Sequence, residues 1–151
     1  MELTRRDVLA LSAGAAALAL TGLEAEPALA TPEAAHESLM AFTGGKTPQS
    51  GKISLTAPEI AENGNTVPVS VAVESPMTAD DHVAAVMLLA EHNPNPGVIT
   101  FHFTPMSGKA QAATRMRLAK TQNVTAVAKM SDGSVYMDKK LVKVTIGGCG
   151  G

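Results

Sequence analysis

The sequence predicts an all-β fold: an immunoglobulin-like antiparallel β-sandwich of about seven strands, with one N-terminal helix and a flexible glycine-rich C-terminal tail. The first observation is a series of short segments in which apolar and polar residues alternate, separated by turns of Gly, Pro and Asn. The second is the composition, which is 45% hydrophobic but only 3% aromatic. Such a chain can bury a core, and that core must consist mainly of Val, Ala, Leu, Ile and Met.

Residues 1–30 have the pattern of a twin-arginine (Tat) signal peptide, which is removed on export and is not part of the fold. Arg5 and Arg6 precede an apolar stretch that ends near Gly22. At roughly 15 residues this stretch is shorter than the ~20 that a membrane-spanning helix needs, so we prefer a cleaved signal to a retained anchor. Ala28 and Ala30 are the small residues that a signal peptidase reads. We therefore predict cleavage after Ala30 and a periplasmic mature protein.

The mature chain is expected to form one domain, with a helix and a sandwich over residues 31–146 and a tail over 147–151. A helix is predicted at its start. Thr31 suits the N-cap position and Pro32 suits the first helical turn. Gly44 and Gly45 are expected to end the helix, because glycine adopts the left-handed backbone of a C-cap without strain.

The hydrophobic period then changes to two, which predicts strands. Four valines share one face of segment 66–73, where Pro68 favours an edge position or the start of the ladder. The apolar run 82–91 suits either a helix or a strand, and we interpret it as a central strand because its neighbours are strands. Arg115 and Arg117 are expected to face solvent. The predicted strands cover residues 52–56, 66–73, 82–91, 98–104, 114–118, 124–130 and 135–146.

Charge and cysteine content exclude several classes of function. The formal charge of the whole chain is −2, which gives no basic field for nucleic acid. A single cysteine excludes an internal disulfide and a multi-cysteine zinc site. None of the four histidines has a partner at the spacing of a local metal pair, so surface or packing roles are expected, with His102 facing solvent or a partner. The histidines are His36, His82, His92 and His102.

The C-terminus carries the candidate chemistry. Cys149 is the only cysteine, and it is flanked by Gly147, Gly148, Gly150 and Gly151. Because glycine lacks a Cβ, these residues make a flexible, narrow arm that carries the sulfur to roughly 10 Å beyond the last strand at full extension. The last eight residues contain no His, Lys or Arg, so activation of the thiol is expected from a partner. We predict that Cys149 is a covalent attachment point presented to the active sites of other proteins.

The terminal pentapeptide, the twin-arginine signal and the predicted sandwich resemble the SoxY family, the sulfur-carrier subunits of bacterial thiosulfate oxidation. The internal segments 67–71, 74–78, 102–105 and 128–134 resemble that family too. The resemblance implies a periplasmic carrier without a cofactor, which is not itself an enzyme and does not contact the membrane after signal cleavage. It also implies pairing with a second sandwich protein, SoxZ, as a heterodimer or heterotetramer.

The same resemblance implies a reaction cycle on the thiol of Cys149. A haem enzyme of the SoxAX type would oxidatively join thiosulfate to the sulfur, and a dimanganese hydrolase, SoxB, would release sulfate. A molybdenum–haem enzyme, SoxCD, can oxidise the sulfane sulfur that remains, and hydrolysis regenerates the carrier. In this cycle no residue of the chain is a catalyst.

Two other functions stay open on the residues alone. One is a periplasmic metal-binding or redox module that uses Cys149 together with Met and His, and Cu(I) titration would reveal it. The other is a purely structural assembly subunit. Removal of residues 1–30 leaves equal numbers of acidic and basic residues. This zero net charge and the expected exposure of Val-rich edge strands are compatible with a permanent interface.

Overall fold

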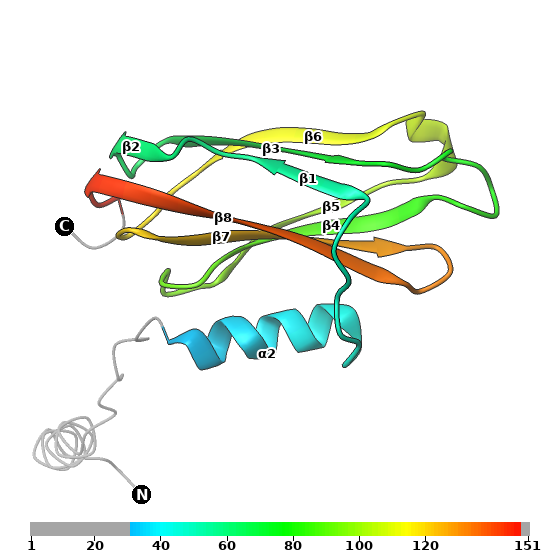
Figure 1. Cartoon of the computed structure of the whole chain (residues 1–151), viewed down its shortest axis with the longest axis horizontal. Coiled ribbons are helices and arrows are strands. Elements are labelled where there is room, and N and C mark those ends of the chain that lie inside the picture. The colour runs from blue at the N-terminus through cyan, green and yellow to red at the C-terminus, as the bar shows by residue number, and fades with distance from the viewer. Residues whose placement is uncertain (1–30, 149–151) are drawn as a thin grey trace, which may run out of the picture.

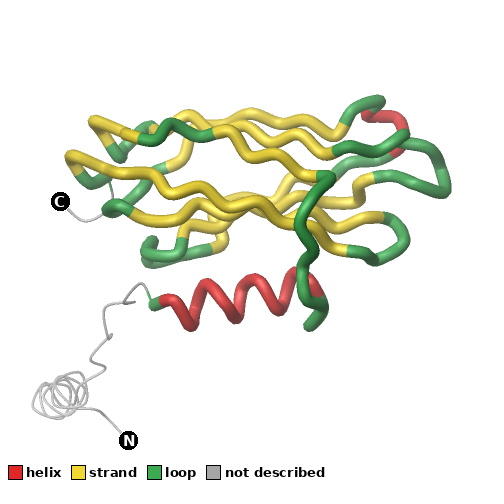
Figure 2. The backbone as a smooth tube through the Cα atoms, viewed as in Figure 1, coloured by secondary structure: helices red, strands yellow, loops and turns green. Residues whose placement is uncertain are grey.

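The computed structural model describes residues 31–148, which form two β-sheets packed face to face with one helix outside them (Figure 1, Figure 2). This arrangement confirms the predicted all-β sandwich with an N-terminal helix. The predicted signal, with Arg5, Arg6 and the cleavage site after Ala30, lies outside the described residues. So do three residues of the tail: Cys149, Gly150 and Gly151.

Helix α2 spans Pro32–Thr43 and has the predicted ends. The side chain of Thr31 accepts a hydrogen bond from the backbone N–H of Ala34, and Gly44 closes the helix with a left-handed φ of 66°. Leu39 and Phe42 pack on the outer face of the larger sheet, against a cluster formed by Met87, Leu89, Val127 and Met137. Within residues 31–148, no helix has both the length and the apolar character to cross a membrane.

The smaller sheet contains three antiparallel strands in the order β1-β3-β6. Their bounds are Ile53–Thr56, Val67–Val73 and Ala110–Met116. The expected exposure of a Val-rich edge strand is wrong: β3 lies at the centre of this sheet, and its four valines are buried in the core. Pro68 is accommodated because it stands near the start of β3, beyond the pairing with β1, which begins at Ser70.

The larger sheet contains five strands in the order β2-β8-β7-β4-β5. Their bounds are Ile60–Asn63 (β2), Val83–Ala90 (β4), Gly97–His102 (β5), Gln122–Met130 (β7) and Val135–Ile146 (β8). The run 82–91 is therefore a strand, as predicted, and β4 lies between β7 and β5. Its continuous apolar character follows from burial on both faces, since the smaller sheet covers one face and α2 the other (Figure 1).

Two features depart from the predicted sandwich. The sequence predicted seven strands, and the described residues contain an eighth, β2, which pairs with β8. This pairing is parallel, whereas all strands were expected to be antiparallel. The sequence did not predict β2, because the strand has only four residues and only Ala61 is buried. Such a segment shows no clear alternation of apolar and polar residues.

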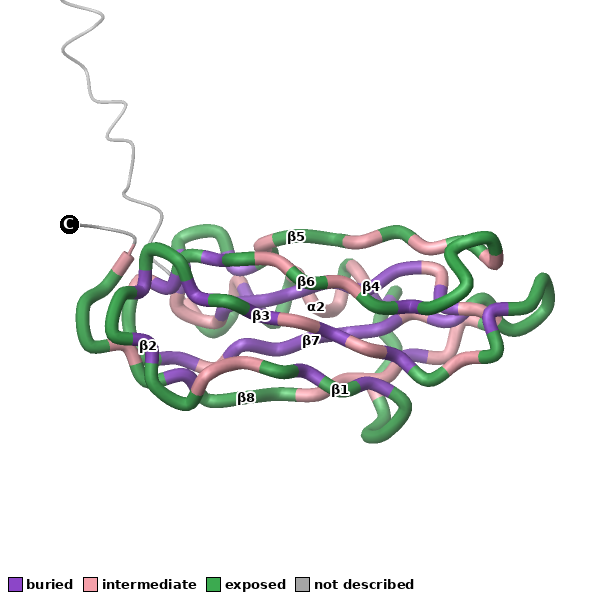
Figure 3. Tube along the Cα trace, turned by 90° about the horizontal axis from the view of Figure 1, so that it is seen from above, coloured by how far each residue is buried: buried purple, intermediate pink, exposed green. Residues whose placement is uncertain are grey.

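The main core lies between the two sheets, and it is made mostly of aliphatic side chains. Buried residues are concentrated along the inner strands β3, β4 and β7 (Figure 3). Met116 and Leu118 point into it, while Arg115 and Arg117 are exposed, as the alternation in this segment predicts. A short 3-10 helix, η1, at Pro105–Ser107 connects β5 and β6 at one end of the sandwich. The C-terminal end of β8 lies at the other end, beside β2 (Figure 1).

Candidate functional site

The predicted site residues fall on both sides of the boundary of the described chain. Cys149, Gly150 and Gly151 are outside it, and Gly147 and Gly148 are inside it. Strand β8 carries these two glycines to the end of the sandwich where β2 also ends. The structure therefore describes Gly147 and Gly148, which we call the base of the tail. Cys149 is the next residue in the sequence.

Backbone hydrogen bonds join the base of the tail to two loops that are distant in sequence. The N–H of Gly64 donates to the carbonyl oxygen of Ile146 (2.7 Å). The N–H of Leu118 donates to the carbonyl oxygen of Gly64 (2.8 Å). The N–H of Gly148 in turn donates to the carbonyl oxygen of Leu118 (2.8 Å). The first two glycines of the tail thus lie against the β2–β3 and β6–β7 loops. Their predicted role as part of a flexible arm stays a prediction.

The β6–β7 loop is itself held from behind by buried polar side chains. Asn93 donates to the carbonyl oxygen of Arg117 (2.7 Å) and accepts from the backbone N–H of Ala119 (3.0 Å). Gln122 donates to the same Asn93 oxygen (3.0 Å) and accepts from the backbone N–H of His92 (2.7 Å). Asn93 and Gln122 are almost fully buried, so these bonds are shielded from competing water. The loop that receives Gly148 is therefore rigidly placed.

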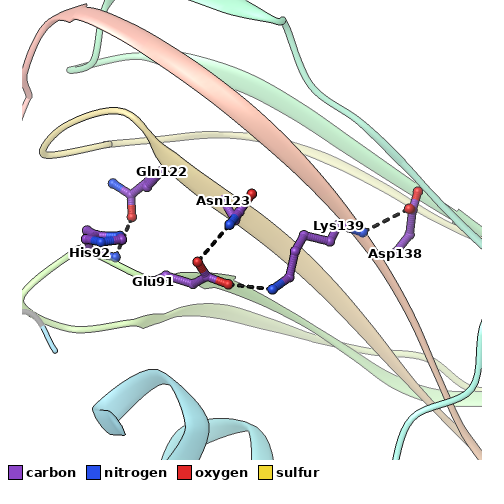
Figure 4. A network of polar contacts seen from close by, with 6 residues as sticks. All are labelled: Glu91, His92, Gln122, Asn123, Asp138 and Lys139. Carbon is purple, nitrogen blue, oxygen red and sulfur yellow. Dashed lines mark hydrogen bonds and ion pairs between the residues drawn. The ribbon is translucent and has the colours of Figure 1, made fainter. Parts of the chain in front are cut away.

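A second polar network lies on the helix-covered side of the larger sheet (Figure 4). Glu91 accepts hydrogen bonds from Lys139 Nζ (2.6 Å) and from Asn123 (2.9 Å). Burial raises the pKa of Glu91, but these hydrogen bonds and the positive charge of Lys139 outweigh it, so the pKa is held below its ordinary value. The network joins the end of β4 to β7 and β8, and none of its side chains hydrogen-bonds to Gly147 or Gly148, the described residues of the tail.

The lowered pKa of Glu91 predicts a pH-dependent stability difference. A carboxylate whose folded pKa is depressed stabilises the fold above its ordinary pKa of 4.5, and this stabilisation is lost as the pH falls through the lower folded value. We expect Glu91→Gln to be less stable than wild type at neutral pH by less than about 1 kcal/mol, because Lys139 is partly exposed. Urea unfolding at neutral and acid pH would measure this, with the exposed Glu62→Gln as control. A difference that persists unchanged in acid would contradict the assignment.

The histidines are dispersed over the molecule. His36 and His102 are exposed, which confirms the prediction for His102, and Nδ1 of His82 lies 3.1 Å from the carbonyl oxygen of Thr78. Nδ1 of His92 is buried without a hydrogen-bond partner in the described chain. Between residues 31 and 148, no three His, Cys, Asp or Glu side chains gather as a metal site. Cys149 lies outside these residues, and its use in a metal site stays a hypothesis.

Sequence reasoning missed Gly64 and Asn93. Both stand in segments that signal turns, Asn63-Gly64-Asn65 and Asn93-Pro94-Asn95, and a turn is a sufficient local reason for each residue. Their contacts to the tail and to its supporting loop involve residues far along the chain. No local pattern reports such contacts.

The family model described as "Sulfur oxidation protein SoxY" matches residues 39–149, a span that includes Cys149. The chain belongs to the SoxY family. One similar solved structure is the sulfur carrier protein SoxY from Chlorobium limicola f thiosulfatophilum, with 34% identity and a TM-score of 0.63. That match covers 77% of this chain and 100% of the Chlorobium SoxY. Comparison with curated proteins finds no match.

The SoxY sandwich is also similar to superoxide reductases. The neelaredoxin of Ignicoccus hospitalis matches with 17% identity and a TM-score of 0.56, over 78% of this chain and 95% of that one. The superoxide reductase of Nanoarchaeum equitans matches with 14% identity and a TM-score of 0.52, over 63% of this chain and 99% of that one. At these identities the likeness shows a shared fold alone.

Proposed function

We propose that this SoxY-family protein is a periplasmic covalent carrier of sulfur intermediates in thiosulfate oxidation, with the thiol of Cys149 as the attachment point. The observation that carries the proposal is the family match, which extends to the single cysteine of the chain. The similar Chlorobium protein is described as a sulfur carrier, which supports the same role here. The proposed export signal agrees with a function outside the cytoplasm.

In the proposed cycle, every intermediate is bonded to the sulfur atom of Cys149. Oxidative joining of the Cys149 thiol to thiosulfate forms an S–S bond and gives Cys–S–S–SO₃⁻, with two electrons passing to a haem partner and one proton to solvent. Hydrolysis then consumes one water, releases sulfate and two protons, and leaves the persulfide Cys–S–S⁻. A molybdenum–haem partner then accepts six electrons from the outer sulfur, while three waters supply its oxygens and release six protons, which converts the persulfide to Cys–S–SO₃⁻. A final hydrolysis with one water releases sulfate and a proton and restores the thiol.

The proposed partners are those that membership of the SoxY family implies. A SoxZ-like subunit would complete a heterodimer or heterotetramer, and enzymes of the SoxAX, SoxB and SoxCD types would bind transiently. The chain needs no cofactor or metal of its own, because bond formation and electron transfer occur in the partner active sites. Its own task is to present a thiol that several enzymes can reach in turn.

The test is an intact-mass measurement on the protein purified from cells supplied with thiosulfate, before and after treatment with a reductant. We expect additions with the mass of sulfur or thiosulfate on the peptide that contains Cys149, all removed by the reductant. The same spectrum is expected to show a mature chain that begins at Thr31. An unmodified thiol together with a bound metal ion would instead support the metal-binding alternative.

A further inference from the structure

Three glycines stand where the tail leaves the sandwich, and none of them has room for a side chain. A Cβ on Gly147 would overlap the carbonyl oxygen of Ala119, and one on Gly148 would overlap the backbone of Gly64. A Cβ on Gly64 would overlap the carbonyl oxygen of Leu118 and lie 2.8 Å from the Gly148 nitrogen. Real Cβ atoms essentially never approach within 3.0 Å of such atoms. We call Gly64, Gly147 and Gly148 the glycine junction.

These three positions require glycine because there is no room for a Cβ atom, and not because of their backbone conformation. None of the three has a φ in the left-handed region, where glycine would be favoured for conformational reasons. Gly44 is the opposite case, since its φ is 66° and nothing lies within 4 Å of a built Cβ. Gly64 is also buried, although it stands in a turn. The junction is therefore a backbone-to-backbone contact that no other residue type permits.

We propose that the glycine junction anchors the tail through Gly148, and that Gly64 is a positioning residue for Cys149. This inference rests on the proposed carrier function and assigns the two halves of the terminal motif different roles. Gly147 and Gly148 hold the origin of the arm against the β2–β3 and β6–β7 loops, and the arm itself begins at Cys149. Cys149 is the next residue after the anchored Gly148 in the sequence.

The anchor changes how partner enzymes meet the thiol. An arm that starts at Ile146 would let the sulfur sweep a sphere of roughly 10 Å, whereas an anchored arm holds it close to one end of the sandwich. The partner active site must then be shaped to receive that end of the protein. A fixed origin also reduces the conformational freedom that each loading event would otherwise remove.

Amide hydrogen exchange tests the anchor without reference to sulfur chemistry. We expect the Gly148 N–H of the mature wild-type protein to be protected, because it donates to the Leu118 carbonyl oxygen. Gly64→Ala should lower that protection roughly tenfold or more while leaving amides in the centre of β7 unchanged. Gly97→Ala is the matched control, since Gly97 has no left-handed φ and nothing within 4 Å of a built Cβ. Exchange of the wild-type Gly148 amide at the rate of an unstructured peptide would overturn the proposal.

Kinetics test the positioning role. With the partner enzyme that loads thiosulfate, we expect Gly64→Ala to lower kcat/KM for the carrier roughly tenfold or more. The reason is that displacing the Cys149 thiol from its position in the partner active site slows the reaction. Gly97→Ala should match wild type. If Gly64→Ala does not fold, Gly148→Ala takes its place, since its Cβ would open the same contact from the tail side. Unchanged kinetics in a variant that has lost the Gly148 protection would overturn the positioning role.

The two proposals fail in different ways. A wild-type protein with no sulfur adduct but a protected Gly148 amide would refute the carrier function and keep the anchor. A wild-type protein that carries the adduct on Cys149 with an unprotected Gly148 amide would refute the anchor and keep the carrier.

Discussion

Cys149→Ser is expected to abolish thiosulfate-dependent turnover of the reconstituted system, reducing it to the rate without carrier. Every intermediate of the proposed cycle is bonded to the sulfur of this residue, and a serine oxygen cannot form the S–S bond with thiosulfate. The loss is therefore complete and not partial. The measurement is electron transfer to the haem partner with saturating thiosulfate. Thermal unfolding should be unchanged, because the substitution replaces one atom.

A relocated thiol provides the matched control for this variant. Met106 belongs to η1 and is 97% exposed. The short helix η1 lies at the opposite end of the sandwich from the end of β8 (Figure 1). The double variant Cys149→Ser with Met106→Cys restores an accessible thiol on the same fold, and we expect it to remain inactive. Turnover by the single Cys149→Ser variant would exclude the covalent carrier and favour the purely structural subunit. Rescue by the cysteine at position 106 would show that the tail has no special role.

Asn93→Ala is expected to produce the largest loss of stability among the polar substitutions. The Asn93 side chain satisfies the Arg117 carbonyl, the Ala119 N–H and the Gln122 amide in a nearly water-free site. Removing it leaves buried groups without partners, which costs about 2–4 kcal/mol in the free energy of unfolding. For a domain of this size that corresponds to a Tm lower by roughly 10 °C. Calorimetry of the mature protein measures it.

Asn95→Ala is the control for Asn93→Ala, because Asn95 is exposed in the same turn. It should shift Tm by a few degrees at most. Asn93→Ala should also weaken protection of the Gly148 amide, since the β6–β7 loop that accepts its hydrogen bond loses its support. A Tm equal to that of wild type would contradict the role assigned to this buried network.

Much of the fold could be predicted because its signals are local. Thr31 and Gly44 mark the two ends of α2 through the backbone conformations that a cap requires. The run 82–91 became a strand with both faces covered, for which continuous apolar character is the expected pattern. Strand β2 could not be found, because only one of its four residues is buried and its partner β8 lies about 80 residues further along the chain.

The candidate site also contains residues that the sequence reveals and residues that it does not. Cys149 and its glycine neighbours can be recognised directly, since the motif that they form consists of five consecutive residues. Gly64 could not be recognised, because a glycine between two asparagines is fully explained by a turn. Its contact with Gly148 joins residues that are distant in the sequence and lie at the end of the β2–β8 pair.

The sequence alone determined the helix and its ends, most of the strands, the aliphatic nature of the core and the single thiol in a glycine tail. Each of these depends on the conformational preferences and burial pattern of residues close together in the chain. The tertiary structure decided that β3 is central, that β2 is parallel to β8, that Gly147 lies against Ala119 and that Gly148 lies against Gly64. These features depend on which distant segments meet, and the free energy that selects those meetings comes from packing the whole core at once.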